Sequence, residues 1–141
     1  MAVLLAGAAS WWQAGQAGEA VRDRDAALAA GRSAAEVLGS ADGRDREGTR
    51  ARWRAVADGP LAAELAGVEP ESTTSAAVAE AALTRLDRTA GTAGLIAVLR
   101  LRQTLADGTV TTDRRRVSVE LARRDGGWRA TALTTVPVGA P

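Results

Sequence analysis

Arginine supplies every basic side chain in this sequence, because its 18 basic residues include no lysine. Three patches of arginines stand out, Arg44–Arg54, Arg114–Arg116 and Arg123–Arg124. A nucleic-acid surface needs such patches on one face, aromatic side chains that stack on bases, and a basic net charge. Here Phe and Tyr are absent, acids interrupt the patches and the net charge is only +1. We therefore expect solvated surface arginines, some of which block edge-to-edge strand pairing, and no nucleic-acid partner.

Carboxylates could act as general acids and bases, but only where two of them converge in one pocket. The strand positions that we expect to face inward are apolar, so no pair of acids is brought together there. Other acids fall in expected turns, where a carboxylate commonly bonds to the local backbone. These turn acids are Asp42, Asp45, Asp107 and Asp125.

The sequence contains neither histidine nor cysteine. A Ser-His-Asp triad, a Cys-His pair and an ordinary zinc site therefore cannot be built. Gly91 and Gly94 do not form a phosphate loop, since that motif requires a lysine. We expect a protein that is not an enzyme, with no catalytic, cofactor-binding or metal-binding residues and no cofactor.

Trp53 and Trp128 are the bulky side chains most able to shape the interior. Hydrophobic residues make up 46% of the sequence, but most of them are alanines, so each aromatic matters more than usual. A buried aromatic side chain removes about 150–250 Å² from water. The two tryptophans either line a small apolar cavity between helices and sheet or fill a core that is short of other aromatics, and the composition favours the second interpretation.

The first element that must position these residues is a long helix over Gln13–Leu38. This segment is rich in strong helix formers and contains no proline. Val21, Leu28 and Ala35 recur every seven residues, and Leu38 continues the stripe. Because the stripe is narrow and rich in alanine, we expect this helix to pack closely against a flat partner such as a sheet.

Two shorter helices are expected next. The first covers Arg44–Ala57 and carries Trp53 on its apolar side. Gly59 suits the end of one helix and Pro60 the first turn of another, so a third helix is expected from Leu61 to about Gly67.

Four strands follow, according to the alternation of apolar and polar residues and the Asp-Gly turns between some of them. In the third strand Val117, Val119 and Leu121 are expected to face inward, and Arg114–Arg116 to lie just before it. The pattern predicts an α+β domain over residues 13–141, with helices within 13–67 and an antiparallel meander within 76–136. The expected strands are Ala77–Leu86, Leu95–Leu105, Arg116–Arg123 and Trp128–Val136.

Residues 1–12 form an almost wholly apolar stretch, shorter than the roughly 20 residues that span a bilayer. A secretory signal would require a basic residue near its start, and no basic residue precedes Arg22. Three interpretations stay open: the start of a buried helix, an interfacial anchor with Trp11 and Trp12 at the lipid headgroups, or the outer end of a transmembrane helix that begins outside this sequence. The third agrees best with a helix that continues without a break.

Three segments of this sequence carry a family resemblance: Arg22–Leu38 (RDRDAALAAGRSAAEVL), Ala57–Leu65 (ADGPLAAEL) and Arg116–Trp128 (RVSVELARRDGGW). They resemble the Mce-associated membrane proteins of actinobacteria, which accompany mammalian-cell-entry lipid importers. The resemblance implies a nuclear-transport-factor-2 (NTF2, SnoaL-like) cone, in which a curved antiparallel sheet of about four strands wraps a long helix. It also implies an N-terminal membrane anchor and a supporting role in a lipid-import complex, with no catalytic residues.

We therefore expect a non-enzymatic accessory protein of the cell envelope, anchored in the plasma membrane on its extracytoplasmic face, with protein partners in a membrane complex. The alternative is a SnoaL-like domain that binds or converts a small molecule, because such cones commonly hold a cavity. A cytosolic interaction module, in which Ala2–Trp12 packs into the core, is a third possibility. The sequence gives neither the partner's identity nor the oligomeric state.

Overall fold

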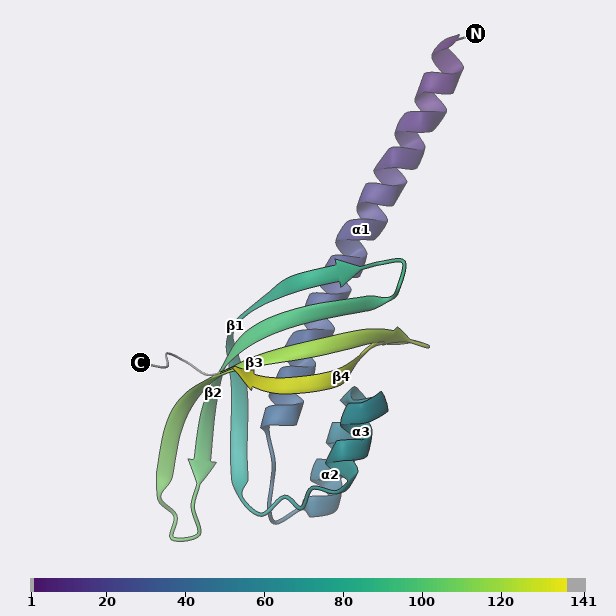
Figure 1. Ribbon diagram of the computed structural model, residues 1–141. Coiled ribbons are helices and arrows are strands. Elements are labelled where there is room, and N and C mark those ends of the chain that lie inside the picture. The colour runs from purple at the N-terminus through teal and green to yellow at the C-terminus, as the bar shows by residue number, and fades with distance from the viewer. Residues whose placement is uncertain (1, 137–141) are drawn as a thin grey trace.

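The computed structural model describes the backbone of residues 2–136 and the side chains of residues 15–136. Three helices precede four strands, which confirms the predicted α+β order (Figure 1). The helices are α1 (Ala2–Gly39), α2 (Arg46–Val56) and α3 (Gly59–Ala66), and the strands are β1 (Thr73–Asp87), β2 (Thr92–Thr104), β3 (Val110–Arg124) and β4 (Gly127–Val136).

The four strands form one antiparallel meander in the order β1-β2-β3-β4. The register shifts twice between β1 and β2 and once between β3 and β4. Such bulges bend a strand and increase its twist, so they give the sheet the curvature visible in Figure 1. Gly108 and Gly126 adopt φ angles of 86° and 88° in the turns after β2 and β3, a conformation that glycine tolerates and other residues rarely adopt.

Helix α1 crosses one face of the sheet, here called the inner face, and contacts all four strands. The predicted flat partner is therefore confirmed. The buried residues of α1 in this contact are Ala27, Gly31, Ala34 and Ala35, and Leu28 and Leu38 are partly buried beside them. The expected stripe was wrong at Val21, which is 57% exposed. Residues two apart on a helix point to nearly opposite sides, and the neighbours Glu19 and Asp23 face the end of the sheet, where both pair with Arg88.

Helices α2 and α3 lie beside β4. Asp45 caps the start of α2 by accepting a hydrogen bond from the Gly48 backbone amide at 3.0 Å. Pro60 lies in the first turn of α3, as the sequence predicts. The prediction for Gly59 was wrong, because α2 ends with its cap at Ala57 and Gly59, with a φ of 57°, is the first residue of α3. The backbone joins them to the sheet, because the Asp58 amide donates to the Ala130 carbonyl at 2.8 Å.

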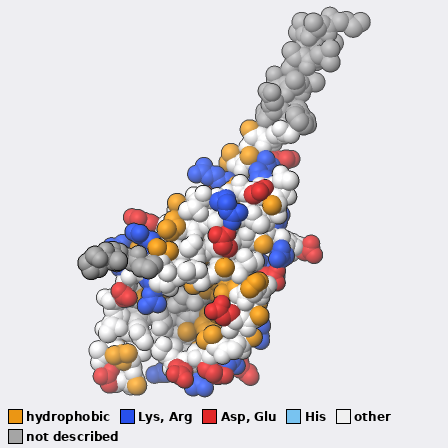
Figure 2. All heavy atoms as spheres, viewed as in Figure 1, with side chains coloured by type: hydrophobic (Ala, Val, Ile, Leu, Met, Phe, Trp, Pro, Cys, Tyr) orange, Lys and Arg blue, Asp and Glu red, His pale blue; other side chains and the backbone are white. Residues whose placement is uncertain are grey.

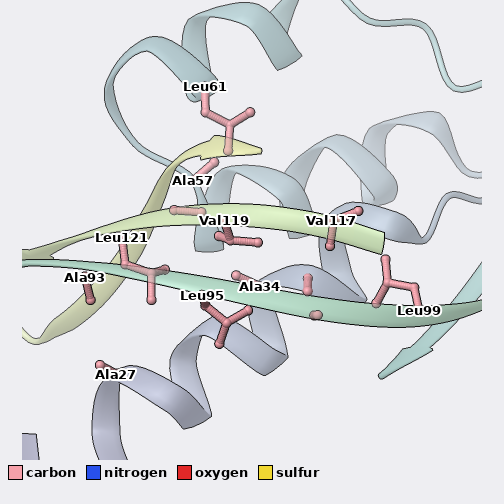
Figure 3. Close-up of a cluster of buried hydrophobic side chains, with 13 residues drawn as sticks. Ala27, Ala34, Ala57, Leu61, Ala93, Leu95, Leu99, Val117, Val119 and Leu121 are labelled. Carbon is pink, nitrogen blue, oxygen red and sulfur yellow. The ribbon is translucent and has the colours of Figure 1, made fainter. Parts of the chain in front are cut away.

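The core lies between α1 and the inner face of the sheet, where Leu95, Leu121 and Val119 approach the alanines of α1 (Figure 3). The inward positions predicted for β3 are confirmed, since Val117, Val119 and Leu121 are at most 2% exposed. Large side chains on the sheet therefore meet small ones on the helix, which keeps the two layers close.

The strands are longer than predicted. The strand pairing of β1 begins at Thr73 rather than Ala77, and that of β3 at Val110 rather than Arg116. Arg114–Arg116 consequently lies within a strand and not just before it, which corrects the prediction. The first residues of β3 are mostly threonines and arginines, and all of them are exposed. An exposed strand segment needs no apolar alternation, so the apolar pattern did not predict this part of β3.

Helix α1 is continuous from Ala2 to Gly39, as predicted for a first stretch that runs on into the long helix. Trp11 and Trp12 belong to α1, but their side chains lie outside the described residues. Among the residues that the structure describes, no helix is both long enough and apolar enough to span a membrane.

Candidate functional site

The inner face of the sheet is closed along most of its length. Leu95 and Val119 are 0% exposed, and Leu99 and Leu121 are 2% exposed. Their side chains fill the space that α1 would otherwise leave open (Figure 3). The part of the fold where a cone would hold a large substrate is thus filled by aliphatic side chains.

Trp53 lies in α2 and is 6% exposed. Its indole Nε1 donates a hydrogen bond to the Ser40 carbonyl at 2.9 Å, so the side chain fastens α2 to the end of α1. A buried indole N–H normally finds such a partner. The described contacts of Trp53 are those of a packing residue.

Trp128 is half-buried at the start of β4, where it packs against the edge of the core. The guanidinium carbon of Arg123 lies 5.0 Å from the centre of its ring, a distance suited to a cation–π contact. The structure therefore does not bring Trp53 and Trp128 together: one joins two helices and the other covers a strand end.

One small hollow of about 220 Å³ opens on the inner face at the C-terminal end of α1. We call it the inner hollow. Its polar side chains are partly engaged, because Ser40 Oγ donates to the Glu36 carbonyl and accepts from the Ala76 amide, while Arg115 pairs with Asp113 at 3.8 Å. The lining residues are Leu38, Gly39, Ser40, Ala41, Thr74, Leu99, Leu101, Arg115, Val117, Leu133 and Thr135.

At the opposite end of the sheet, arginines and aspartates join the turns to the helices. Asp23 of α1 accepts from Arg88 Nε at 2.8 Å and lies 3.4 Å from Arg123 Nη2. The hydrogen bond from Arg88, helped by both positive charges, holds the pKa of Asp23 below its ordinary value of 3.8. Arg124 pairs with Asp58, and mainly through that hydrogen bond it lowers the pKa of Asp58. This cluster ties α1 and the start of α3 to the sheet.

The face of the sheet that points away from α1, here called the outer face, carries four more arginines. Arg100 and Arg102 alternate with the inward residues of β2, and Arg114 and Arg116 with those of β3. None of the ion pairs found among residues 15–136 includes any of these four. Alternation in the sequence correctly predicted that Arg100 and Arg102 face away from the core. It did not predict that they lie beside Arg114 and Arg116.

Two of the acids predicted to lie in turns bond to the local backbone as expected. Asp42 accepts a hydrogen bond from the Arg44 amide and Asp107 accepts one from the Thr109 amide, each at 2.9 Å. Within the described part of the chain, no three acidic side chains gather as they would around a metal ion. Acidic and basic side chains are interspersed over the face of the molecule shown in Figure 2.

No protein-family model matches this sequence, and no curated protein matches it either. Solved structures do. The chain is similar to CagV, a VirB8 homologue of the T4SS of Helicobacter pylori, with a TM-score of 0.60 at 6% identity over 79% of this chain and 97% of that one. It is also similar to a putative aromatic ring hydroxylase of Novosphingobium aromaticivorans, with a TM-score of 0.57 at 16% identity over 82% of this chain and 94% of that one.

A third similar structure is an NTF2-like protein involved in plasmid conjugation, with a TM-score of 0.58 at 12% identity. The match covers 82% of this chain but 49% of that protein, so the chain spans about half of its length. At these identities the likeness establishes the fold. The chain has an NTF2-like fold, with three helices packed on a curved antiparallel sheet of four strands, as the resemblance seen in the sequence implies.

Proposed function

We propose that this chain is a non-enzymatic accessory domain of the cell envelope that binds protein partners. The closed inner face carries the proposal, because the space where a cone would hold a substrate is occupied by Leu95, Leu99, Val119 and Leu121. A domain whose inner face is filled in this way offers chiefly its outer surfaces for binding. Its catalytic groups would also have to work without histidine or cysteine.

The tether in this proposal is α1. The helix is continuous from Ala2 to Gly39, its first residues are apolar in sequence, and its exposed segment before Ala27 leads away from the sheet (Figure 1). An apolar helix start with two tryptophans suits the water-facing border of a bilayer. We propose that residues 1–12 contact the plasma membrane and that the NTF2-like domain stands on its extracytoplasmic face.

The kind of assembly is proposed from two likenesses. The sequence segments that resemble Mce-associated proteins favour a complex for lipid import of the mammalian-cell-entry type. The similar structures include a VirB8 homologue of a T4SS and a protein involved in plasmid conjugation, which shows that this fold serves in proteins of such processes. Because one fold hosts many functions, these likenesses support a partner-binding role and do not choose the partner.

Fractionation of the native host tests this proposal. We expect the full-length protein in the membrane fraction, and expect a variant with Trp11→Ser and Trp12→Ser to move towards the soluble fraction. Cross-linking in intact cells, followed by purification, should recover the wild-type chain with subunits of a lipid-import complex. Recovery of the wild-type protein from the cytosol alone would overturn the proposal.

The inner hollow supports a second candidate, a SnoaL-like domain that binds a small molecule. The observation in its favour is that apolar walls from Leu99 and Leu133 meet one positive side chain, Arg115, which suits a small apolar anion. Titration with 1-anilinonaphthalene-8-sulfonate tests it. Binding that is lost in Leu133→Trp, with circular dichroism unchanged, would favour this candidate, and equal weak binding by both proteins would exclude it.

A further inference from the structure

The four arginines of the outer face lie in one block because of the register between β2 and β3. Arg100 is directly opposite Arg114, Arg102 is opposite Thr112, and Arg116 is opposite Val98. Residues opposite each other in an antiparallel pair point to the same side of the sheet, with neighbouring strands about 4.8 Å apart. We call Arg100, Arg102, Arg114 and Arg116 the arginine face.

Placing two like charges directly opposite each other destabilises a sheet, so the pair of Arg100 and Arg114 needs an explanation. The same outer face shows how such a charge is normally balanced, because Arg85 there pairs with Glu120. Among the described residues, no acid is paired with any arginine of the arginine face. The balancing acids are missing at one end of the outer face and present at the other.

Two acids do lie nearby, and neither neutralises the block. Asp113 is opposite Leu101, and its ion-pair partner is Arg115, at 3.8 Å, and not an arginine of the block. Glu80 is opposite Val98, whose other neighbour is Arg116, so β2 separates Glu80 from Arg116 by two strand spacings, roughly 10 Å. The arginine face therefore keeps an excess of positive charge in this part of the molecule.

The surface between these arginines is hollowed and partly apolar. A shallow open hollow of about 800 Å³ lies among β1, β2 and β3. Arg100, Arg102 and Arg114 line it together with small side chains of β1, such as Ala77, and with Asp113. At the end of the same hairpin, Leu105 and Val110 are 41% and 43% exposed. Leu105 and Val110 add apolar surface beside the basic one, and apolar patches rimmed by polar residues mark interaction sites when they are large.

We propose that the arginine face binds an acidic, extended segment of a partner protein. In an extended chain every second side chain points to one side, and these side chains repeat at about 6.8 Å. Arg100 and Arg102 repeat in the same way, as do Arg114 and Arg116, so carboxylates on alternate residues of the partner meet both rows. Arginine suits this role because its planar guanidinium binds a carboxylate with two hydrogen bonds. This inference rests on the proposed function, since it names a surface through which the domain binds proteins.

The position of the arginine face favours a protein over a membrane. The paired rows run towards the β2–β3 turn, at the end of the molecule away from the start of α1 (Figure 1). From residue 12 to residue 39, α1 rises about 40 Å at 1.5 Å per residue, several times the screening length of about 8 Å in physiological salt. Lipid headgroups around the start of α1 are therefore out of reach. Nucleic acid is disfavoured because none of the residues lining this hollow is aromatic.

The test uses the full chain and a fluorescent 14-residue peptide in which glutamate alternates with valine. Wild-type protein should bind this peptide, with an affinity that falls as salt is raised. The variant with Arg100→Gln and Arg114→Gln should bind at least tenfold more weakly while melting at the same or a higher temperature, because the like-charge pair is gone. The matched control, Arg32→Gln with Arg54→Gln, removes two exposed arginines elsewhere and should bind as wild type does.

The remaining outcomes each decide the proposal. Equal binding by wild type and by Arg100→Gln with Arg114→Gln would overturn it, as would an equal loss in the control variant, which would mean that only total charge matters. Single-stranded DNA, or vesicles containing phosphatidylglycerol, bound more tightly than the peptide through the same arginines would overturn the choice of a protein partner. Failure of the envelope proposal is separate, because it shows in host fractionation and leaves peptide binding by the purified chain unchanged.

Discussion

Gly31 of α1 lies so close to Leu95 of β2 that a β-carbon on Gly31 would come within 2.6 Å of Leu95 Cδ1. The same β-carbon would also lie 3.2 Å from Leu121 Cδ1. Leu95 and Leu121 are almost fully buried, so neither side chain can swing into solvent. The missing side chain at Gly31 is what allows the helix to lie flat on the sheet.

We expect Gly31→Ala to destabilise the protein. Alanine favours a helix over glycine by about 1 kcal/mol, but forcing a methyl group into a packed core costs about 1–3 kcal/mol. The net effect should be a loss of about 1 kcal/mol in the free energy of unfolding, measured by urea denaturation. The control is Gly15→Ala in the same helix, where nothing lies within 4 Å of the new β-carbon, and which should be neutral or stabilising. A Gly31→Ala protein more stable than wild type would mean that the two leucines yield.

This contact also shows what the sequence could predict of the helix and what it could not. Helix propensity and alanine content predicted α1 and its flat partner correctly. A periodic apolar stripe, however, marks large side chains, and it selected Val21, which is 57% exposed. The helix approaches Leu95 and Leu121 closely at Gly31, where there is no side chain for a stripe to detect. Which turns of the helix are covered depends on the extent of the sheet, and that is set by residues far along the chain.

Trp53 should matter more to stability than Trp128. Trp53→Phe removes the indole N–H that bonds to the Ser40 carbonyl, and leaving a partly buried acceptor unpaired costs about 1–3 kcal/mol. Trp128 is only half-buried, so Trp128→Phe should cost less, chiefly through its contact with Arg123. Chemical denaturation of both variants measures the difference. A larger loss for Trp128→Phe would contradict the role assigned to Trp53.

The arginine face shows the corresponding limit for the strands. Alternation within one segment indicated that Arg100 and Arg102 face away from the core, and the structure agrees. The register between two strands is not written in either of them. It follows here from the β2–β3 turn, which brings Arg114 opposite Arg100, and β3 begins directly after that turn at Val110, well before the start that the apolar pattern indicated.

Stability should fall at low pH through Asp23. Its pKa in the folded protein lies below 3.8 because of Arg88 and Arg123, so its ion pairs contribute stability above about pH 3.8 and lose it as the pH falls through the lower folded value. We expect Asp23→Asn to lower the urea midpoint at pH 7, and expect the gap to wild type to close at acid pH. Asp25→Asn, at an exposed acid nearby on α1, should leave the midpoint unchanged. A gap that persists at acid pH would contradict the ion-pair explanation.

Thr49 is the buried polar residue on which the junction between α1 and α2 depends, with 0% exposure. Its Oγ1 accepts from the Asp42 amide at 3.0 Å and donates to the Asp42 carbonyl at 3.2 Å. Thr49→Val keeps the shape of the side chain but leaves the Asp42 amide without this acceptor, at a cost of about 1–3 kcal/mol. Thr49→Ser keeps the hydroxyl and loses one methyl group, so it should cost about 1 kcal/mol or less. Urea denaturation compares the stabilities of the two variants. Because the junction also positions the Ser40 carbonyl for Trp53, the intrinsic tryptophan fluorescence, to which Trp53 contributes, should change in Thr49→Val and stay close to wild type in Thr49→Ser. If Thr49→Ser were the more damaging variant, packing of the methyl group and not the pair of hydrogen bonds would hold the junction.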